Sequence, residues 1–473
     1  MTSQYWGEDK EIEYKRTVPQ EKVKFLKDII AFANTSGGRV ILGVDEDSQE
    51  VVGLEDNNPF KLSDAITNMI ADNCTPQIDT IISVKALEGV TVLEIQVFPG
   101  RFRPYYLKNK SKKDSVYIRV NGTSRLAGEA KIKELELEGQ NVIYDSLPEI
   151  GVEFDESRAL KLCDDMKAIA LRRCTSEEDK LQVKDVSLGK LEDFGVLGRI
   201  GNDIVPTHAF MLMSDNKNSM AKIQCAVFKG TNRNVFVDRR EYHGAIQEQL
   251  EEAFQFVVRN IRIGGEVKGL FTEDVYEIPL ATIREAIANA VVHRSYIENS
   301  CIQVSLYDDR LEVVSPGGIY GGLRIEDIKT GRSQCRNTAI VNAFQYMKLI
   351  DSWGTGIPRI MSECEQYGLK EPIWEEFADG IKLTIFRRAS DKKQAIKASD
   401  KKQAIKTSAR KQAIKTSEHK EQIIIYLKEH GESRVSEIAS AIGLSNDRTR
   451  VILLSMIEVV AEGNNKNRTY RLK

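Results

Sequence analysis

IPLATIREAIANAVVHRSY, residues 278–296, is the stretch that decides the fold of the central region. Its apolar residues recur with helical spacing, which predicts a helix over Leu280–His293. Glu285, Asn289 and His293 are four residues apart, so they share one face of that helix. Such a carboxylate can orient or deprotonate a water, and such an amide oxygen can coordinate Mg²⁺. An alternative for His293 is a structural pair with Arg294 at the helix end.

The elements predicted downstream give residues 276–388 a two-layer α/β pattern. Strands are predicted at Cys301–Tyr307, Arg310–Val314 and Ile381–Phe386, and helices near Ala339–Leu349 and Ile357–Tyr367.

Three further motifs follow the helix in order: SPGG at Ser315–Gly318, RN at Arg336-Asn337, and DSWGTGIPRI, which contains Gly354 and Gly356. With the helix, they resemble the GHKL ATPases in the variant known as the RecG-like C-terminal domain. The resemblance implies a domain that binds ATP and Mg²⁺ and hydrolyses ATP slowly.

The resemblance also implies roles for individual residues. Glu285 would be the general base, and Asn289 would be the metal ligand. Gly317 and Gly318 would form the floor of the base pocket beside Ser315. Gly354, Thr355 and Gly356 would approach the phosphates with bare backbone, and Arg336 would contact phosphate.

Ser315 departs from the family pattern. GHKL enzymes usually read the adenine amino group with an aspartate before the first glycine, whereas this chain has Ser315 followed by Pro316. A GHKL-like fold retained as a scaffold is therefore an alternative. A helicase motor is not expected, because the sequence has no GxxxxGK[ST] phosphate loop.

The N-terminal region, residues 1–130, combines a helix over Glu21–Asn34 with strands at Arg39–Val44, Val90–Val97 and Ser115–Val120. The runs EIEYKR, FANTSGGRVILGVDED, VVGL and SVYIRVNGTSRLA resemble the AlbA-type domain of the Schlafen family. Members of that family bind nucleic acid, and some cleave RNA.

Basic residues and glycine turns in this region fit phosphate binding. Lys15, Arg119 and Arg125 can supply cations, and the turns at Gly37-Gly38 and Gly122 can present backbone N–H groups.

A metal-dependent nuclease, with a role in antiviral defence, is the alternative for the N-terminal region. Glu8 and Glu13 have the E-xxxx-E spacing of the Schlafen nucleases, Lys15 follows, and Asp45 lies after the first strand. Carboxylates in this arrangement can hold Mg²⁺ or Mn²⁺ for phosphodiester hydrolysis.

Residues 131–275 predict a connecting α/β domain, with a strand at Ile223–Phe228, a helix at His243–Ile261 and no catalytic cluster. Residues 389–417 contain a nine-residue repeat: ASDKKQAIK occurs twice and TSARKQAIK follows. This segment is interpreted as a basic linker, and the alternative adds a contribution to phosphate affinity.

Residues 418–473 have the pattern of a winged helix. Helices are predicted at Glu418–His430, at Val435–Ile442 and from Asn446 to about Val460, with a terminal strand at Asn467–Leu472. In the third helix, Arg448, Thr449 and Arg450 would reach base edges, and Lys466 and Arg468 of the wing would contact phosphates. The alternative is a winged helix used for protein contacts.

Composition fits a multidomain chain of α/β and α+β parts in the cytoplasm. The chain has 473 residues with a net charge of -2, and its seven cysteines contain no CxxC pair. No signal peptide or apolar span is present, so no membrane partner is expected. The sequence predicts a DNA-binding transcriptional regulator with a GHKL-like ATP-binding domain, which forms a homo-oligomer. RNA is an alternative partner, and an assembly scaffold is a further alternative function.

Overall fold

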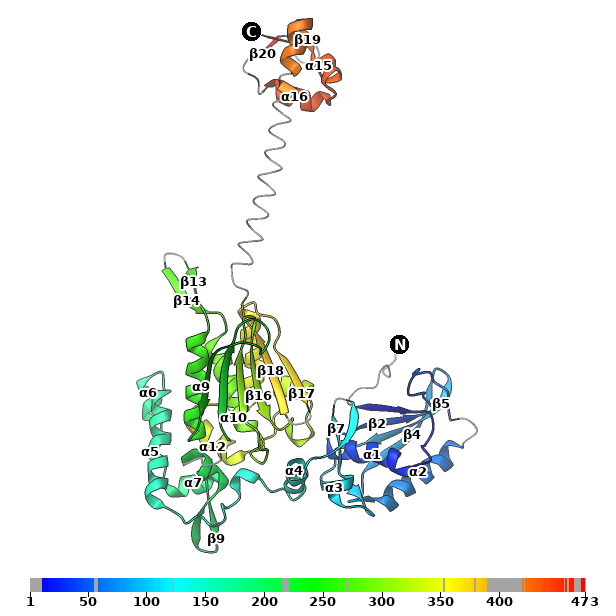
Figure 1. The fold of residues 1–473 in the computed structure, drawn as a ribbon, viewed down its shortest axis with the longest axis vertical. Coiled ribbons are helices and arrows are strands. Elements are labelled where there is room, and N and C mark those ends of the chain that lie inside the picture. Colours follow the sequence, from blue (N-terminus) through cyan, green and yellow to red (C-terminus); the bar gives the residue numbers. More distant parts are fainter. Residues whose placement is uncertain are drawn as a thin grey trace. The chain divides into compact units, whose positions relative to one another are not determined.

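The computed structural model describes residues 11–54, 58–120, 122–214, 221–268, 271–351, 354–377, 380–388, 419–420, 422–454, 456, 459–462 and 469–472. The chain divides into two compact units, Met1–Arg388 and Ala389–Lys473. Both units mix helices with sheets, as predicted (Figure 1). The three copies of the nine-residue repeat lie outside the described residues.

A four-stranded sheet of order β1-β2-β5-β4 forms the base of the N-terminal region (blue in Figure 1). β1 pairs in parallel with β2, and the other neighbours are antiparallel. The sheet strands are β1 (Ile12–Lys15), β2 (Gly38–Leu42), β4 (Thr80–Leu87) and β5 (Val90–Val97); the helices are α1 (Lys22–Asn34), α2 (Pro59–Asn73) and α3 (Lys112–Ser115); the short strands are β3 (Cys74–Thr75), β6 (Tyr106–Leu107), β7 (Tyr117–Val120) and β8 (Thr123–Leu126).

The turn that follows α1 is fixed by packing. Asn34 is buried, and its Nδ2 donates to the carbonyls of Tyr105 and Tyr117, each at 2.9 Å. Gly37 has a φ of +80° and donates its N–H to the Phe32 carbonyl. A Cβ added at Gly38 would overlap the Phe32 ring. The Gly37-Gly38 turn, predicted to offer N–H groups to phosphate, therefore serves the close packing of α1 on β2.

A six-stranded sheet of order β12-β11-β15-β16-β18-β17 forms the centre of the larger unit. β11 pairs in parallel with β15, so the boundary predicted at residue 275 falls inside one folded layer. The physical reason is a single apolar core, which extends from Ala159 to Ile385. The strands are β9 (Leu197–Ile200), β10 (Asp203–Pro206), β11 (Ile223–Phe228), β12 (Phe236–Tyr242), β13 (Ile263–Lys268), β14 (Phe271–Tyr276), β15 (Ile302–Leu306), β16 (Arg310–Pro316), β17 (Ile373–Phe377) and β18 (Gly380–Phe386).

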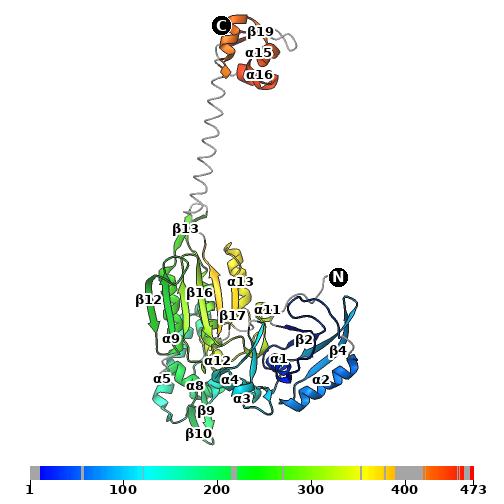
Figure 2. The same cartoon turned by 45° about the vertical axis from the view of Figure 1, so that its right-hand side comes forward.

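Helix α10 (Leu280–His293) coincides with its prediction and packs against both the sheet and neighbouring helices. Its alanines and branched residues are buried on most sides, as expected for a helix between other elements. It contacts β16, α9 and α13, and α13 also contacts α11 (Figure 2). The remaining helices are α4 (Glu129–Gly139), η1 (Tyr144–Ser146), α5 (Glu156–Arg172), α6 (Glu177–Leu181), α7 (Leu188–Phe194), α8 (His208–Ser214), α9 (Ile246–Asn260), η2 (Tyr320–Gly322), α11 (Ile325–Lys329), α12 (Thr338–Tyr346) and α13 (Gly356–Gln366).

The smaller unit contains helical residues 422–430, then α15 (Val435–Ile442) and α16 (Asn446–Leu454). The three-stranded sheet has the order β19-β21-β20, formed by β19 (Ser433–Arg434), β21 (Thr469–Leu472) and β20 (Val459–Glu462). The third helix was predicted to reach about Val460, but Val459 and Val460 pair with β21. This pairing buries Tyr470 in the core of the unit, which a longer helix would prevent.

Among the residues that the structure describes, none of the helices combines the length and the apolar character needed to cross a bilayer.

Candidate functional site

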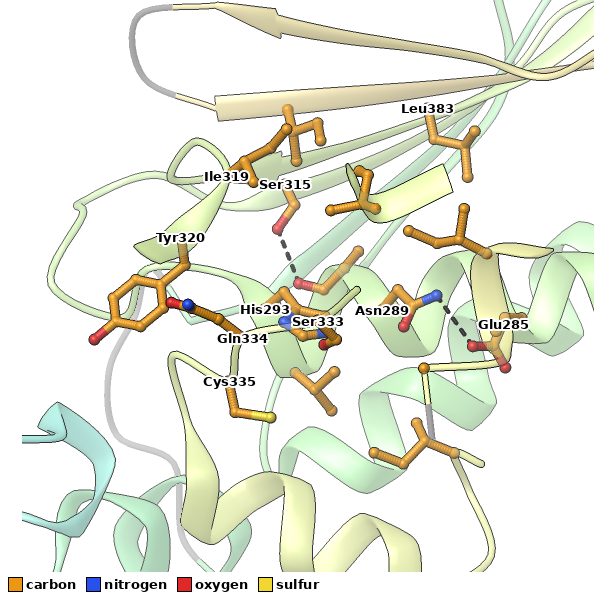
Figure 3. A pocket seen from close by; sticks show the side chains of 18 of the residues that line it. Glu285, Asn289, His293, Ser315, Ile319, Tyr320, Ser333, Gln334, Cys335 and Leu383 are labelled. Carbon is orange, nitrogen blue, oxygen red and sulfur yellow. Dashed lines mark hydrogen bonds between the residues drawn. The ribbon is translucent and has the colours of Figure 1, made fainter. Parts of the chain in front are cut away.

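A pocket of about 410 Å³ lies where α10, the sheet and two glycine-containing loops meet (Figure 3). It brings together residues that are up to 98 positions apart in the sequence, from Glu285 to Leu383. Seven of the predicted site residues line it: Glu285, Asn289, Ser315, Gly317, Gly318, Gly354 and Gly356. Thr355 and Arg336 are not among the residues that line this pocket.

Glu285 and Asn289 interact across one turn of α10, as their spacing predicts. Nδ2 of Asn289 donates to Oε1 of Glu285 at 3.1 Å. Glu285 is buried, and burial raises the pKa of its carboxyl, while Arg359 opposes that shift. The donated N–H leaves the amide oxygen of Asn289 as the group that can bind a cation or a water.

Arg359 and Asp351 form ion pairs at the Glu285 end of the pocket, and the sequence analysis missed both; Arg359 itself is not among the residues that line the pocket. Arg359 Nη2 lies 2.7 Å from Oε2 of Glu285, and its Nη1 pairs with Asp351. Asp351 also lines the pocket. The sequence did contain a signal for the position of Arg359. It lies three residues after Gly356, and therefore one turn into the same helix.

Two glycines have no room for a side chain. Gly354 has a φ of +65°, and a Cβ there would overlap the carbonyl oxygen of Gly331. A Cβ at Gly356 would overlap the Glu285 carboxylate, which lies against the first turn of α13. The positive end of that helix can favour a negative group at this position.

The opposite end of the pocket is more apolar and contains Ser315. Its hydroxyl donates to the Ala290 carbonyl at 2.9 Å, and its side chain is buried. The oxygen lone pairs are left to accept a hydrogen bond from a ligand. The apolar lining of the pocket includes Val313, Ile319 and Leu383.

His293 also lines the pocket, on the same helix face as Glu285 and Asn289. Burial, with the Arg336 charge nearby, lowers the pKa of its imidazole to about 4. The ring is therefore neutral at physiological pH and can accept or donate a hydrogen bond there.

Arg336 lies outside the pocket, which corrects its predicted contact with phosphate. Its guanidinium pairs with Glu134 at 2.6 Å and donates to the carbonyls of His293 and Gly318. Arg336 is buried, so it joins α4 to the floor of the pocket and is committed to protein partners.

The cations predicted to bind phosphate in the N-terminal region are mostly inside the fold. Lys15 lies 2.9 Å from Glu13 and 3.3 Å from Asp28. Arg119 lies 2.7 Å from the same Glu13, and its side chain is only 3% exposed. Asp28 holds the pKa of Lys15 above its ordinary value, although burial alone would lower it.

The cluster of Lys15, Arg119, Glu13 and Asp28 changes two predictions: that the two cations bind phosphate, and that Glu13 belongs to a metal site. Lys15 and Arg119 are each paired with carboxylates inside the fold, and Glu13 contacts both cations. Arg125 is exposed and its Nε donates to the Thr123 hydroxyl.

Asp45, another nuclease candidate, belongs to no metal-binding group among the described residues. Asp45 accepts hydrogen bonds from the backbone and hydroxyl of Ser48, and these bonds lower its pKa. Glu8 lies outside the described residues. Within the described ranges, no group of three or more His, Cys, Asp or Glu side chains could hold a metal ion.

In the smaller unit, α16 presents Arg448 and Arg450 to solvent, whereas Thr449 between them is fully buried. Thr449 thus packs inside the unit and does not face a base edge as predicted. Lys466 and Arg468 lie outside the described residues.

Comparisons with known proteins agree with the motifs. Residues 8–128 match the family model described as "Schlafen, AlbA_2". Residues 299–385 match the family model described as "Putative ATP-dependent DNA helicase recG C-terminal". The chain combines a Schlafen AlbA_2 domain with a RecG C-terminal, ATPase-like domain. Both resemblances found in the sequence are confirmed, although the second match begins after α10 and so excludes Glu285 and Asn289.

Two solved structures are similar in sequence. The DIP2311 protein of Corynebacterium diphtheriae is 19% identical over 98% of this chain and 92% of its own, with a TM-score of 0.42. The N-terminal domain of a RecG-related protein from Nitrosomonas europaea is 25% identical over 23% of this chain and 75% of its own, with a TM-score of 0.19. The comparison with curated proteins gave no match.

Proposed function

We propose that this chain is a DNA-binding transcriptional regulator whose ATPase-like domain binds ATP with Mg²⁺. The observation that carries the nucleotide part is the meeting of α10, the Ser315–Gly318 loop and the Gly354–Gly356 loop around one pocket. These segments supply a carboxylate, an amide and bare backbone, which together suit a metal-bound polyphosphate.

The residues present fit this ligand. Asn289 offers its amide oxygen to the cation, because its N–H is committed to Glu285. A side chain at Gly354 would overlap the Gly331 carbonyl, and one at Gly356 would overlap the Glu285 carboxylate, so both positions need bare backbone. A bound Mg²⁺ ion would neutralise phosphate charge in this site. Glu285 would accept the proton of an attacking water, so that ATP hydrolysis would give ADP and phosphate.

Ser315 can contact adenine in place of the family's aspartate. Its hydroxyl proton is committed to the Ala290 carbonyl, so its oxygen faces a ligand as an acceptor. An exocyclic amino group is a donor that suits this acceptor. A single neutral hydrogen bond is weaker than one to a carboxylate, so adenine selectivity would be modest.

The DNA-binding part of the proposal rests on the two ends of the chain. The AlbA_2 domain belongs to a type associated with nucleic acid. The helices of the smaller unit, its β20–β21 strand pair and the exposed Arg448 and Arg450 on α16 support a winged helix that binds DNA. Nucleotide state would change DNA affinity or assembly, in a homo-oligomer located in the cytoplasm.

Calorimetric titration of the full chain with Mg-ATP tests the nucleotide part. Wild type is expected to bind, and Asn289→Ala to bind about tenfold more weakly or worse, since a charge-assisted contact is lost. The exposed Asn202→Ala is the matched control and should bind as wild type does. Failure of wild type to bind Mg-ATP would contradict the proposal.

A second titration tests the DNA part. Fluorescence anisotropy of labelled DNA, measured at increasing salt, should show affinity that falls as salt rises. Equal DNA affinity and equal oligomer size with and without Mg-ATP would contradict coupling between the two activities.

A further inference from the structure

Arg359 connects two carboxylates at the polar end of the pocket. It lies on the first turns of α13, where one Nη atom bonds Oε2 of Glu285 at 2.7 Å and the other pairs with Asp351. Both carboxylates belong to residues that line the pocket. The guanidinium therefore contacts the carboxylate that is proposed as the base.

With this arrangement, both oxygens of Glu285 are already engaged. Oε1 accepts from Asn289 and Oε2 accepts from Arg359 (Figure 3 shows the first of these bonds). An ion pair also stabilises the charged carboxylate and lowers its tendency to take a proton. Movement of the guanidinium away from Glu285 would therefore make its carboxylate a stronger base.

Arg359 is the partner that can move. Its side chain is 39% exposed, whereas that of Glu285 is 5% exposed. Its Nε is buried and has no hydrogen-bond partner among the described residues. A guanidinium has five donors in a fixed fork that matches the oxygens of a phosphate. Phosphate oxygens would therefore be better partners for Arg359 than its present carboxylates.

The charges at this end of the pocket favour movement of the Arg359 guanidinium from a carboxylate to a phosphate. One guanidinium here serves two carboxylates, which leaves an excess of one negative charge when all three are ionised. A phosphate that arrives next to Glu285 meets this negative charge unless a cation turns toward it. Arg359 is the nearby cation that already contacts both carboxylates.

We infer that Arg359 is a specificity-determining residue that exchanges Glu285 for the terminal phosphate of a bound nucleoside triphosphate. This inference rests on the proposed nucleotide binding and deepens it. A diphosphate lacks the terminal group, so the Arg359–Glu285 pair stays closed. The exchange therefore distinguishes triphosphate from diphosphate and releases the base only when a hydrolysable substrate is present.

Separate calorimetric titrations of the full chain with Mg-ATP and Mg-ADP test the exchange. Arg359→Gln should weaken Mg-ATP binding about 10- to 100-fold and change Mg-ADP binding less than about threefold, because only the terminal phosphate loses a charge-assisted contact. Arg199→Gln is the matched control, since Arg199 is exposed and paired with Glu192. It should leave both affinities unchanged.

Folding is controlled by a second variant. Arg359→Gln leaves Glu285 buried without its cation, whereas Glu285→Gln/Arg359→Gln removes both charges and keeps a hydrogen-bonding pair. The double variant should still lose the preference for Mg-ATP over Mg-ADP. Equal weakening of both nucleotides, or no change in their ratio in either variant, would overturn the role of Arg359. Failure of wild type to bind either nucleotide would remove the proposed function itself, and that result is seen before any variant is measured.

Discussion

The N-terminal domain and the pocket of the ATPase-like domain use the same residue types in opposite ways. In the N-terminal domain, Lys15 and Arg119 are enclosed together with Glu13 and Asp28. In the pocket, Glu285 and Asn289 lie at the wall of a cavity of about 410 Å³. From the sequence, Lys15 and Arg119 were predicted to bind phosphate, Glu13 to belong to a nuclease site, Asn289 to bind Mg²⁺ and Glu285 to act as a general base.

The difference shows that the surroundings of a charged group decide its role. A buried cation with carboxylates at 3 Å has its hydrogen-bonding capacity used within the fold, so its loss damages folding. A polar group at the wall of a cavity has capacity left for a ligand, so its loss damages binding. Each prediction below tests one side of this distinction.

The largest effect is expected from Arg119→Ala in the N-terminal domain. The substitution leaves Glu13 without its contact at 2.7 Å and removes a guanidinium stacked on the Phe32 ring. Breaking a buried ion pair costs about 3–5 kcal/mol, which calorimetry would show as a lower unfolding temperature of this domain.

Arg125→Ala is the control for that variant, because Arg125 is exposed. Its unfolding free energy should change by about 0.5 kcal/mol or less. A stable Arg119→Ala protein that binds nucleic acid more weakly would instead support the role predicted from the sequence.

Sequence predicted local geometry well where residue spacing determines it. Glu285 and Asn289 meet because residues four apart on a helix must do so, and the tight approaches at Gly354 and Gly356 admit only glycine. The first and last residues of α10, β5 and β11 also agree with their predictions.

Prediction from the sequence failed where the role of a residue depends on contacts with residues far away in the sequence. Nothing near Arg336 in the sequence shows that Glu134, 202 residues earlier, neutralises it. The parallel pairing of β11 with β15, which removes the boundary at residue 275, is likewise a long-range contact. Burial of Thr449 between two exposed arginines depends on how α16 packs.

Acid should weaken the contact between Glu134 and Arg336. Although burial raises the pKa of Glu134, Arg336 and Lys131 together lower it to about 2, from an ordinary value of 4.5. This carboxylate thus stabilises the fold fully above pH 4.5, and the contribution of about 3 kcal/mol is lost as the pH falls toward 2.

Calorimetry from pH 7 to pH 3 on wild type and Glu134→Gln checks this. The difference in unfolding free energy between wild type and Glu134→Gln should be largest at pH 7 and should shrink below pH 4.5. The exposed Glu156→Gln should behave as wild type throughout. A gap that stays constant with pH would mean that Glu134 is not held charged by Arg336.

A smaller loss of stability, combined with a loss of binding, is expected for Gly356→Ala. The added methyl overlaps the Glu285 carboxylate, and overpacking of this kind costs about 1–3 kcal/mol. Displacement of Glu285 and Asn289 should also weaken Mg-ATP in calorimetric titration. Gly189→Ala in α7 meets only ordinary contacts and should be neutral or slightly stabilising. If Gly356→Ala bound Mg-ATP as wild type does, the glycine would serve packing alone, as Gly38 does.

The smallest effect on stability, and the sharpest test of the smaller unit, comes from α16. Arg448→Ala and Arg450→Ala remove exposed side chains, so each should change the unfolding free energy by about 0.5 kcal/mol or less. If these arginines contact phosphates, each substitution should reduce the slope of log affinity against log salt by about 1. Thr449→Ala, at a buried position of the same helix, should destabilise the unit and leave that slope unchanged. An unchanged slope together with unchanged DNA affinity in both arginine variants would show that α16 does not face DNA, and the smaller unit would then serve protein contacts.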